Sequence, residues 1–273
     1  MLRRYLTNIY VSVSIKNSVS TNVNSSNNNH QPRVVVIFPT LNEAKTIKHC
    51  IDEAKKSKYK PIVIVSDGNS TDKTRDIARE AGAIVITQDV HIHPGKGAGM
   101  VAGLRKAFEF EPDIIVFLDA DITNLTYEWV DQLVEPIAIE GYDMARGWYI
   151  RAAGDAPVTK LVVKPLLWAF FPELWHYEQP LSGEVAGKVE LWKNLINLNP
   201  PKGWGIDIWI LIEATMLGYN IKEVFLGVKS HRSYLRYSSD VSNLAKMSEQ
   251  VAFTIIQEAM KYKRLDNASR IAV

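Results

Sequence analysis

This sequence of 273 residues contains little cysteine, carries a small net charge and has no long apolar run. The single cysteine, Cys50, excludes an internal disulfide framework and favours a reducing compartment, so we expect a cytoplasmic protein. The net charge is only +2, which gives no general attraction to nucleic acid. No apolar run approaches the ~20 residues that a membrane-spanning helix needs. What remains is a globular chain, long enough for one large α/β domain or two small ones.

Residues 1–32 differ in composition from the rest of the chain. The first fifteen residues combine a basic start with scattered apolar side chains, and a Ser- and Asn-rich tract follows, ending in Asn27-Asn28-Asn29. Such a tract buries too little apolar surface to fold by itself, so we expect a flexible N-terminal extension. The alternative is that the first fifteen residues dock peripherally on the inner face of a membrane.

From Arg33 onward, short apolar runs alternate with amphipathic segments. We expect strands over residues 34–38, 61–66, 84–87, 114–118 and 142–149, and helices over 97–110, 127–140 and 241–263. Two further helices should follow the first two strands, with Asn42 as one N-cap and Thr71 or Asp72 as the other. Strands alternating with helices are typical of a doubly wound, mainly parallel sheet. We therefore predict one α/β domain over residues 33–265.

Polar motifs stand where four of these elements begin or end. The segments are Pro39-Thr40-Leu41-Asn42-Glu43, Ser66-Asp67-Gly68, His93-Pro94-Gly95-Lys96-Gly97 and Asp119-Ala120-Asp121. In open α/β sheets, ligands bind just beyond the carboxyl ends of the strands. The four motifs should therefore meet at one edge of the sheet.

Asp119-Ala120-Asp121 is the most informative of these motifs. Two neighbouring carboxylates repel each other unless a cation lies between them, and a carboxylate combined with substrate phosphates is the usual Mg²⁺ arrangement. Lys96, flanked by glycines, can approach a diphosphate as a point charge. The segment is not a Walker loop, and no strand leads into a G-x-G-x-x-G turn. In isolation the aspartates could also form a solvated turn or a helix cap, but the combination predicts a metal-phosphate ligand.

Together the four motifs resemble the nucleotide-sugar-binding half of the GT-A glycosyltransferases, over about residues 33–122, with a first-strand motif like that of family 2. Further strings occur downstream at 158–167, at 179–184 (Gln-Pro-Leu-Ser-Gly-Glu), at 203–207 (Gly-Trp-Gly-Ile-Asp) and at 226–232 (Leu-Gly-Val-Lys-Ser-His-Arg). With them, the sequence is similar to the glucosyl-3-phosphoglycerate synthases and their mannosyl relatives. The resemblance implies a GT-A fold with an acceptor-binding half over 123–240. It also implies retaining transfer of glucose or mannose from a UDP- or GDP-hexose to 3-phosphoglycerate, with Mg²⁺ or Mn²⁺.

The resemblance assigns roles residue by residue. For the donor it implies Pro39, Thr40, Leu41, Glu43, Asp67, Lys96, Asp119, Ala120, Asp121 and Glu184. For the metal it implies Asp121 and His231, for the acceptor Thr159, Lys229, Arg232 and Asp207, and for catalysis Asp207, Glu184 and Lys96. If the reaction inverts the sugar instead of retaining it, Asp207 is the natural general base.

Three departures from the family pattern lie on the acceptor side. Ala156-Pro157 stands where the family has Gly-Arg, Lys229 where it has Arg, and Ser233 where it has Asn. Losing a bidentate guanidinium at an anion site is not conservative. Lys160, Lys229 and Arg232 remain as cations for an anionic acceptor, whose identity the resemblance leaves open.

Two other functions fit the same residues. A polyprenol-phosphate mannosyl- or glucosyltransferase of the dolichol-phosphate type, working at a membrane surface, shares the first-strand motif and the paired aspartates. A nucleotide-sugar-binding protein without turnover would need only the donor half. The helix over 241–263 is expected to pack on the domain or on the partner subunit of a homodimer.

Overall fold

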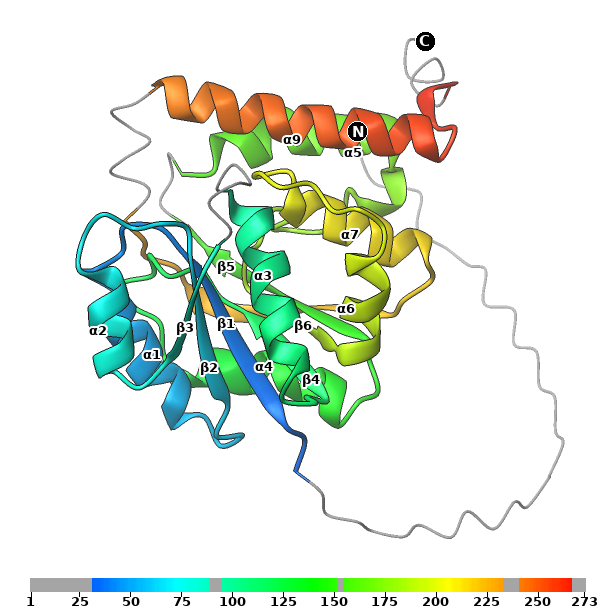
Figure 1. Ribbon diagram of the computed structural model, residues 1–273. Coiled ribbons are helices and arrows are strands. Elements are labelled where there is room, and N and C mark those ends of the chain that lie inside the picture. The colour runs from blue at the N-terminus through cyan, green and yellow to red at the C-terminus, as the bar shows by residue number, and fades with distance from the viewer. Residues whose placement is uncertain (1–30, 89–94, 152–154, 233–240, 267–273) are drawn as a thin grey trace, which may run out of the picture. The chain divides into compact units, whose positions relative to one another are not determined.

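The computed structural model describes residues 31–88, 95–151, 155–232 and 241–266. Residues 1–30 lie outside this set, so the expected N-terminal extension stays a prediction. His93, Pro94 and Ser233 also lie outside it. The chain from Gln31 onward forms one compact unit, shown in Figure 1.

A seven-stranded sheet organises this unit, in the order β3-β2-β1-β4-β6-β5-β7 (Figure 1). The strands are β1 (Val34–Thr40), β2 (Ile62–Asp67), β3 (Ile84–Thr87), β4 (Ile114–Phe117), β5 (Met144–Ile150), β6 (Val185–Lys188) and β7 (Ile221–Val228). Strand β6 runs antiparallel to β4 and β5, while the other four strand pairs are parallel. The predicted α/β fold with a mainly parallel sheet is confirmed. The sequence did not predict β6 and β7.

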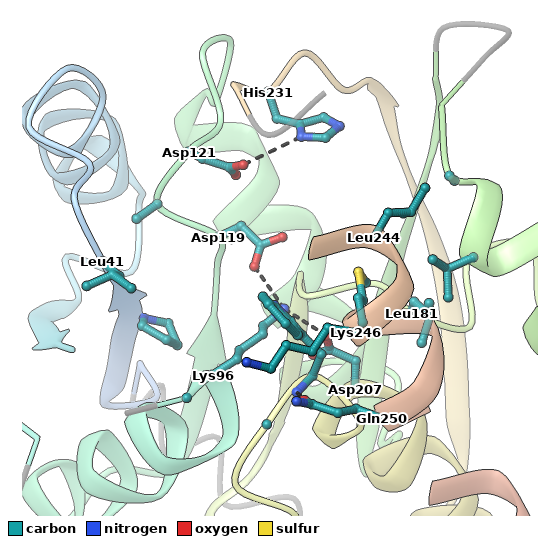
Figure 2. A pocket seen from close by; sticks show the side chains of 18 of the residues that line it. Leu41, Lys96, Asp119, Asp121, Leu181, Asp207, His231, Leu244, Lys246 and Gln250 are labelled. Carbon is teal, nitrogen blue, oxygen red and sulfur yellow. Dashed lines mark hydrogen bonds and ion pairs between the residues drawn. The ribbon is translucent and has the colours of Figure 1, made fainter. Parts of the chain in front are cut away.

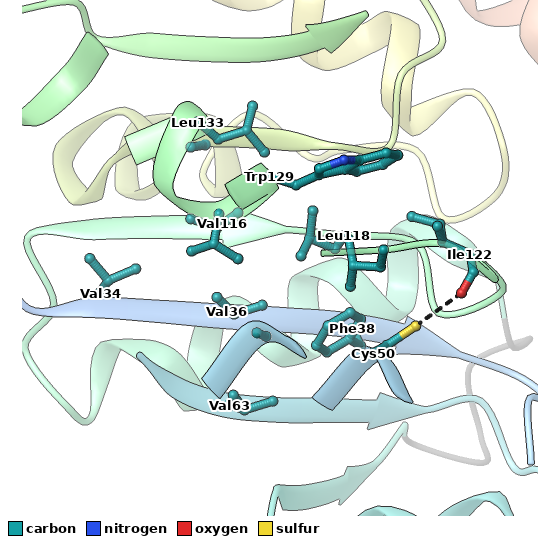
Figure 3. Packing of buried hydrophobic residues seen from close by; sticks show 14 of the residues in the cluster. Val34, Val36, Phe38, Cys50, Val63, Val116, Leu118, Ile122, Trp129 and Leu133 are labelled. Atoms are coloured by element: carbon teal, nitrogen blue, oxygen red, sulfur yellow. Dashed lines mark hydrogen bonds between the residues drawn. The ribbon is translucent and has the colours of Figure 1, made fainter. Parts of the chain in front are cut away.

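Helices cover both faces of the sheet. Helices α1 (Ile47–Lys56), α2 (Thr74–Glu80) and α4 (Tyr127–Ala138) pack on one face, and α3 (Lys96–Phe108), α6 (Val189–Ile196) and α7 (Ile206–Met216) pack on the other. Side chains of a strand alternate between the faces, so Val34, Val36 and Phe38 of β1 join the first layer (Figure 3). Each such fully buried side chain contributes about 1.5–3 kcal/mol.

Helix α7 lies between two layers and is apolar on almost all sides, as a buried helix must be. Ile206 and Ile210 pack toward the sheet. Ile208 and Leu211 pack toward a third layer made of the π-helical turn η1 (Thr159–Val163), α5 (Lys164–Phe170), the 3₁₀ turn η2 (Pro172–Leu174) and α9 (Val241–Lys261). This double packing fixes the first turn of α7, which carries Asp207.

The two predicted N-caps are wrong. Helix α1 begins at Ile47, because Asn42 adopts a left-handed conformation (φ 58°) and its Oδ1 accepts the Thr71 N–H at 2.8 Å. Helix α2 begins at Thr74 with Lys73 at the N-cap position, one or two residues later than expected. Asp72 instead accepts N–H groups from Thr74 at 3.0 Å and from Ala44 at 3.2 Å. Asn42 and Asp72 therefore tie together the two loops that follow β1 and β2.

The longest helix of the described part is α9, with 21 residues. Neither α9 nor any other described helix combines the length and the apolarity that crossing a bilayer requires.

Candidate active site

A cavity of about 730 Å³ opens at the carboxyl ends of β1 and β4 (Figure 2). This volume is within the range of small-molecule sites. Twelve of the predicted site residues line it: Pro39, Thr40, Leu41, Glu43, Lys96, Asp119, Ala120, Asp121, Thr159, Asp207, Lys229 and His231. The expectation that the strand-end motifs meet at one edge of the sheet is thus correct. Asp67, Glu184 and Arg232 are not among the lining residues.

Backbone hydrogen bonds bring His231 to the paired aspartates across more than a hundred residues of sequence. Ile122 and His231 form an isolated antiparallel bridge. On either side of it, the Arg232 N–H donates to the Asp121 carbonyl at 3.0 Å, and the Thr123 N–H donates to the Ser230 carbonyl at 2.9 Å. The segment after β7 is therefore held against the segment after β4, and Asp121 and His231 face each other.

Lys96 occupies the first position of α3, directly at the cavity. The glycines beside it allow the start of α3 to lie against residues 201–203, and the Ala98 N–H donates to the Lys202 carbonyl at 3.0 Å. A Cβ atom on Gly97 would lie 1.9 Å from the Pro201 carbonyl oxygen. The Gly-Lys-Gly pattern is therefore required for the close packing of the start of α3 against residues 201–203.

Five charged side chains form a continuous chain of ion pairs through the site. Lys96 Nζ lies 2.8 Å from Asp207 Oδ2 and 3.0 Å from Asp119 Oδ1. Lys229 Nζ lies 2.9 Å from Asp119 Oδ2 and 2.7 Å from Glu184 Oε1. Burial alone would lower the pKa of Lys229, but Asp119 and Glu184 outweigh it and hold this pKa well above its usual range. Both lysines therefore remain charged, and Asp119 is held between them.

Asp207 has the most unusual environment of these carboxylates. Burial raises the pKa of Asp207 to about 6, and Lys96 offsets only part of this effect. Among the described residues, the buried Oδ1 atom of Asp207 has no hydrogen-bond partner. A carboxylate with a free oxygen and a pKa near neutrality can accept a hydroxyl proton or hold a sugar hydroxyl.

Asp121 and His231 fit a divalent cation. His231 Nδ1 lies 3.5 Å from Asp121 Oδ2, and His231 Nε2 lies 2.9 Å from Asp155 Oδ2. Burial alone would lower the pKa of His231, but its hydrogen bonds with Asp121 and Asp155 raise this pKa to about 9. The described residues contain no cluster of three or more His, Cys, Asp or Glu side chains that could hold a metal. Asp121 would supply an oxygen ligand and His231, once its ring has lost a proton, a nitrogen ligand, so the two side chains can form part of a divalent-cation site that substrate phosphates complete.

Three predicted residues lie just behind the cavity wall. Glu184 is fully buried and pairs with Lys229. Arg232 Nη1 lies 3.0 Å from Glu43 Oε2. Asp67 is also fully buried; its Oδ2 accepts the Ser70 N–H at 2.9 Å, while among the described residues its Oδ1 has no partner. In this structure these side chains hold the lining residues and the loops in place.

The sequence missed several residues of the site. Arg146 on β5 is fully buried, and its Nη2 donates to the carbonyls of Pro180 at 2.9 Å and Ser182 at 3.1 Å, which holds the segment that carries Glu184. Asp155 shares His231 with Asp121. Leu244, Lys246, Met247 and Gln250 of α9 also line the cavity. No motif marked these positions, because their place depends on tertiary packing.

The sheet, the paired aspartates after β4 and the cavity at the strand ends define a GT-A glycosyltransferase. A family model described as mannosylglycerate synthase, GT domain, matches residues 50–252. The chain belongs to this family, and it is a glycosyltransferase.

The relatives are similar over most of the chain. The glucosyl-3-phosphoglycerate synthase of Mycobacterium tuberculosis is 35% identical over 250 residues, covering 82% of this chain and 72% of the relative. That of Petrotoga mobilis is 32% identical over 260 residues, covering 86% and 75%. A crystal structure of the M. tuberculosis enzyme with Mn²⁺, UDP-glucose and phosphoglyceric acid superposes with a TM-score of 0.72 at 34% identity, covering 84% of this chain and 80% of that one. Another, with Mg²⁺ and UDP, has the same TM-score at 33% identity.

Proposed function

We propose that this glycosyltransferase moves glucose from UDP-glucose to a hydroxyl of a small anionic acceptor, with Mg²⁺ or Mn²⁺ bound at Asp121 and His231. The observation that carries the proposal is the meeting of Lys96, Asp119, Asp207, Asp121 and His231 in one cavity. These residues supply a phosphate contact, a metal pair and a carboxylate of raised pKa within a single site.

On the donor side, the loop after β1 and the end of β4 would enclose the nucleoside. Glu43, which lines the cavity, would accept from the base edge, Asp67 would take part from its buried position next to Gly68, and Asp119 would hold the ribose. Lys96 would then contact the diphosphate from the start of α3. Its two ion pairs keep it charged and aimed at the cavity.

Departure of the diphosphate concentrates negative charge on the leaving group. A bound divalent cation stabilises such charge as a Lewis acid. Lys96 adds a fixed positive charge in a site that is partly closed to water, where electrostatic stabilisation is strongest. Asp121 and His231 would hold the cation, and Asp155 would orient the His231 ring from its other side.

Asp207 is the group we assign to the sugar and the acceptor hydroxyl. The family resemblance favours retention of configuration, in which the departing phosphate guides attack on the same face and Asp207 binds hydroxyl groups. In an inverting reaction Asp207 would be the general base. NMR of the anomeric linkage in the product separates the two, because the coupling constant differs between the α- and β-glucosides.

A transfer assay with labelled donor tests the proposed function. Labelled UDP-glucose or GDP-mannose is incubated with the protein and Mn²⁺, with 3-phosphoglycerate in one reaction and a short polyprenyl phosphate in another. We expect the label of UDP-glucose to move into a small, water-soluble anionic product. Label in the lipid fraction would support the polyprenol-phosphate alternative, and the absence of any transfer would refute the proposal.

Membrane contact and homodimer formation are separate from this chemistry and stay predictions. Deleting residues 1–32 and measuring co-sedimentation with anionic liposomes tests the first. Light scattering of the purified protein tests the second. A liposome-bound fraction that falls on deletion would support peripheral docking.

A further inference from the structure

The acceptor wall at residues 156–157 has no side-chain donor. Ala156 presents a methyl group, and Pro157 has neither a charged side chain nor a backbone N–H. The family pattern has Gly-Arg at this place, so the guanidinium that would grip an anion is missing. If the acceptor is anionic, its charge must be met elsewhere in the cavity.

Most of the cations that line the cavity are already neutralised. Lys96 is paired with Asp119 and Asp207, Lys229 with Asp119 and Glu184, and Arg151 Nη1 with Asp155 Oδ2 at 3.2 Å. Lys229, one of the predicted acceptor contacts, is therefore committed to two carboxylates. An added anion would have to compete with those carboxylates for each of these three side chains.

Lys246 is the exception. It lines the cavity from α9, and in the described part of the chain no carboxylate lies within ion-pair distance of it. Figure 2 shows its side chain extending from α9 into the cavity. The positive charge of Lys246 is therefore not neutralised by any carboxylate of the described residues.

The helix that carries Lys246 is anchored at the site. Gln250, one turn further along α9, accepts the Trp204 N–H with its Oε1 at 3.0 Å. The neighbouring Gly205 lies so close to α9 that a Cβ atom there would be 2.0 Å from Thr254 Oγ1. Val251 and Ile255 are fully buried in the third layer. Lys246 thus projects from a packed helix next to the segment that leads into Asp207.

We propose that Lys246 binds the anionic group of the acceptor and so determines acceptor specificity in this protein. Apolar side chains also line the cavity, among them Val158, Leu181, Trp204, Leu244 and Met247, and Gln250 adds an amide one turn along α9. This combination fits a small hydroxy acid or phosphate ester that carries its charge at one end and its reactive hydroxyl toward Asp207. A lysine is a point charge and makes a less directional contact than a bidentate arginine, so one anionic group is sufficient. The inference rests on the proposed function, because it names the residue that recognises the acceptor of that reaction.

Acceptor kinetics test the inference. The wild-type protein and the Lys246→Ala and Lys246→Arg variants are assayed with saturating UDP-glucose and Mn²⁺. The acceptors are 3-phosphoglycerate, glycerol 3-phosphate, glycerate and glycerol. Lys193→Ala on α6, which also removes one exposed lysine from a helix, is the matched control.

In Lys246→Ala we expect the KM for the charged acceptors to rise about tenfold. This is the low end of the effect of a charge-assisted contact, and it applies because Lys246 is exposed. The kcat, the KM for UDP-glucose and the KM for glycerol should not change, and Lys246→Arg should restore most of the affinity. An effect with glycerol 3-phosphate alone identifies phosphate as the group bound, and an effect with glycerate identifies carboxylate.

An unchanged KM for every charged acceptor in Lys246→Ala would overturn the inference while leaving the proposed function intact. An equal rise in the Lys193→Ala control would overturn it too, because the effect would then be one of net charge. If the wild-type protein transfers glucose to none of the acceptors, the proposed function itself fails and the inference fails with it.

Discussion

The donor edge of the cavity and its acceptor side are built from different kinds of structure. Donor residues stand at the ends of β1 and β4 and at the start of α3, so the sheet and its first helices fix them directly. Acceptor-side residues come from the segment after β5, from η1 and from α9, which packs on α7 rather than on the sheet. The acceptor side can therefore change without disturbing the sheet, and the departures at Ala156 and Pro157 lie there, whereas Lys229 directly follows β7.

Removing a metal ligand at the donor edge should reduce transfer activity more than any other change considered below. We expect Asp121→Ala to reduce transfer about 10³-fold, because the positive charge that stabilises the departing diphosphate is lost. The measurement is kcat with UDP-glucose and Mn²⁺, with circular dichroism to check the fold. Asp76→Ala on α2, an exposed aspartate away from the cavity, is the control. Activity within a factor of three of the wild type would exclude Asp121 as a ligand.

Lys229 connects the donor edge with the acceptor side through its ion pairs, and replacing it should lower the stability of the protein. Lys229→Ala leaves Glu184 buried without its cationic partner, while Asp119 keeps Lys96. We expect the free energy of unfolding to fall by about 3 kcal/mol, the low end of the range for breaking a buried ion pair. Urea denaturation measures it. Lys222→Ala on β7, the strand that precedes Lys229, removes an exposed pair with Glu140 and should cost no more than about 1 kcal/mol. Equal losses in the two variants would contradict the role of the buried chain of ion pairs.

Asp207 lies where donor and acceptor must meet, and its titration should shape the pH profile. With a pKa of about 6, the carboxylate is ionised above pH 6 and protonated below it, so kcat/KM should fall as the pH drops through about 6. We expect Asp207→Asn to lower kcat about 10²-fold and to remove this acidic limb. A limb that persists unchanged in the variant would assign the titration to another group.

The smallest effect concerns backbone strain on the acceptor side. Ala156 has φ 59°, a left-handed conformation that disfavours residues with a Cβ atom. We expect Ala156→Gly to raise the free energy of unfolding by about 0.5–1 kcal/mol. Ala102→Gly within α3 should instead lower it by about 1 kcal/mol. A loss of stability in Ala156→Gly would show that the strain is absent.

The difference between the donor edge and the acceptor side also explains which parts of the site could be predicted from the sequence. Apolar runs identified β1, β2, β3 and β4 to within two residues at each end, because buried parallel strands have a continuous apolar pattern. The motifs attached to those strands were therefore placed at the correct edge. His231 was found only through the family resemblance, since the bridge to Ile122 joins segments far apart in the sequence.

Errors arose where tertiary contacts override local preference. Asn42 has the chemistry of an N-cap, but its side chain accepts the Thr71 N–H in the neighbouring loop. Strand β6, which Glu184 precedes, was missed, because its antiparallel pairing with β4 had no sequence signal. Asp155 and Lys246 reach the cavity through packing of β5 and α9, which no local pattern records.

Metal-dependent donor binding is the most direct test of the site. Isothermal titration of UDP into the full-length protein is carried out with Mn²⁺ and with EDTA, for the wild type and for Asp121→Ala. We expect the wild type to bind UDP at least tenfold more tightly with Mn²⁺ than with EDTA, and Asp121→Ala to lose this difference. Equal binding of UDP with and without Mn²⁺ by the wild type would contradict a donor site completed by a metal at Asp121 and His231.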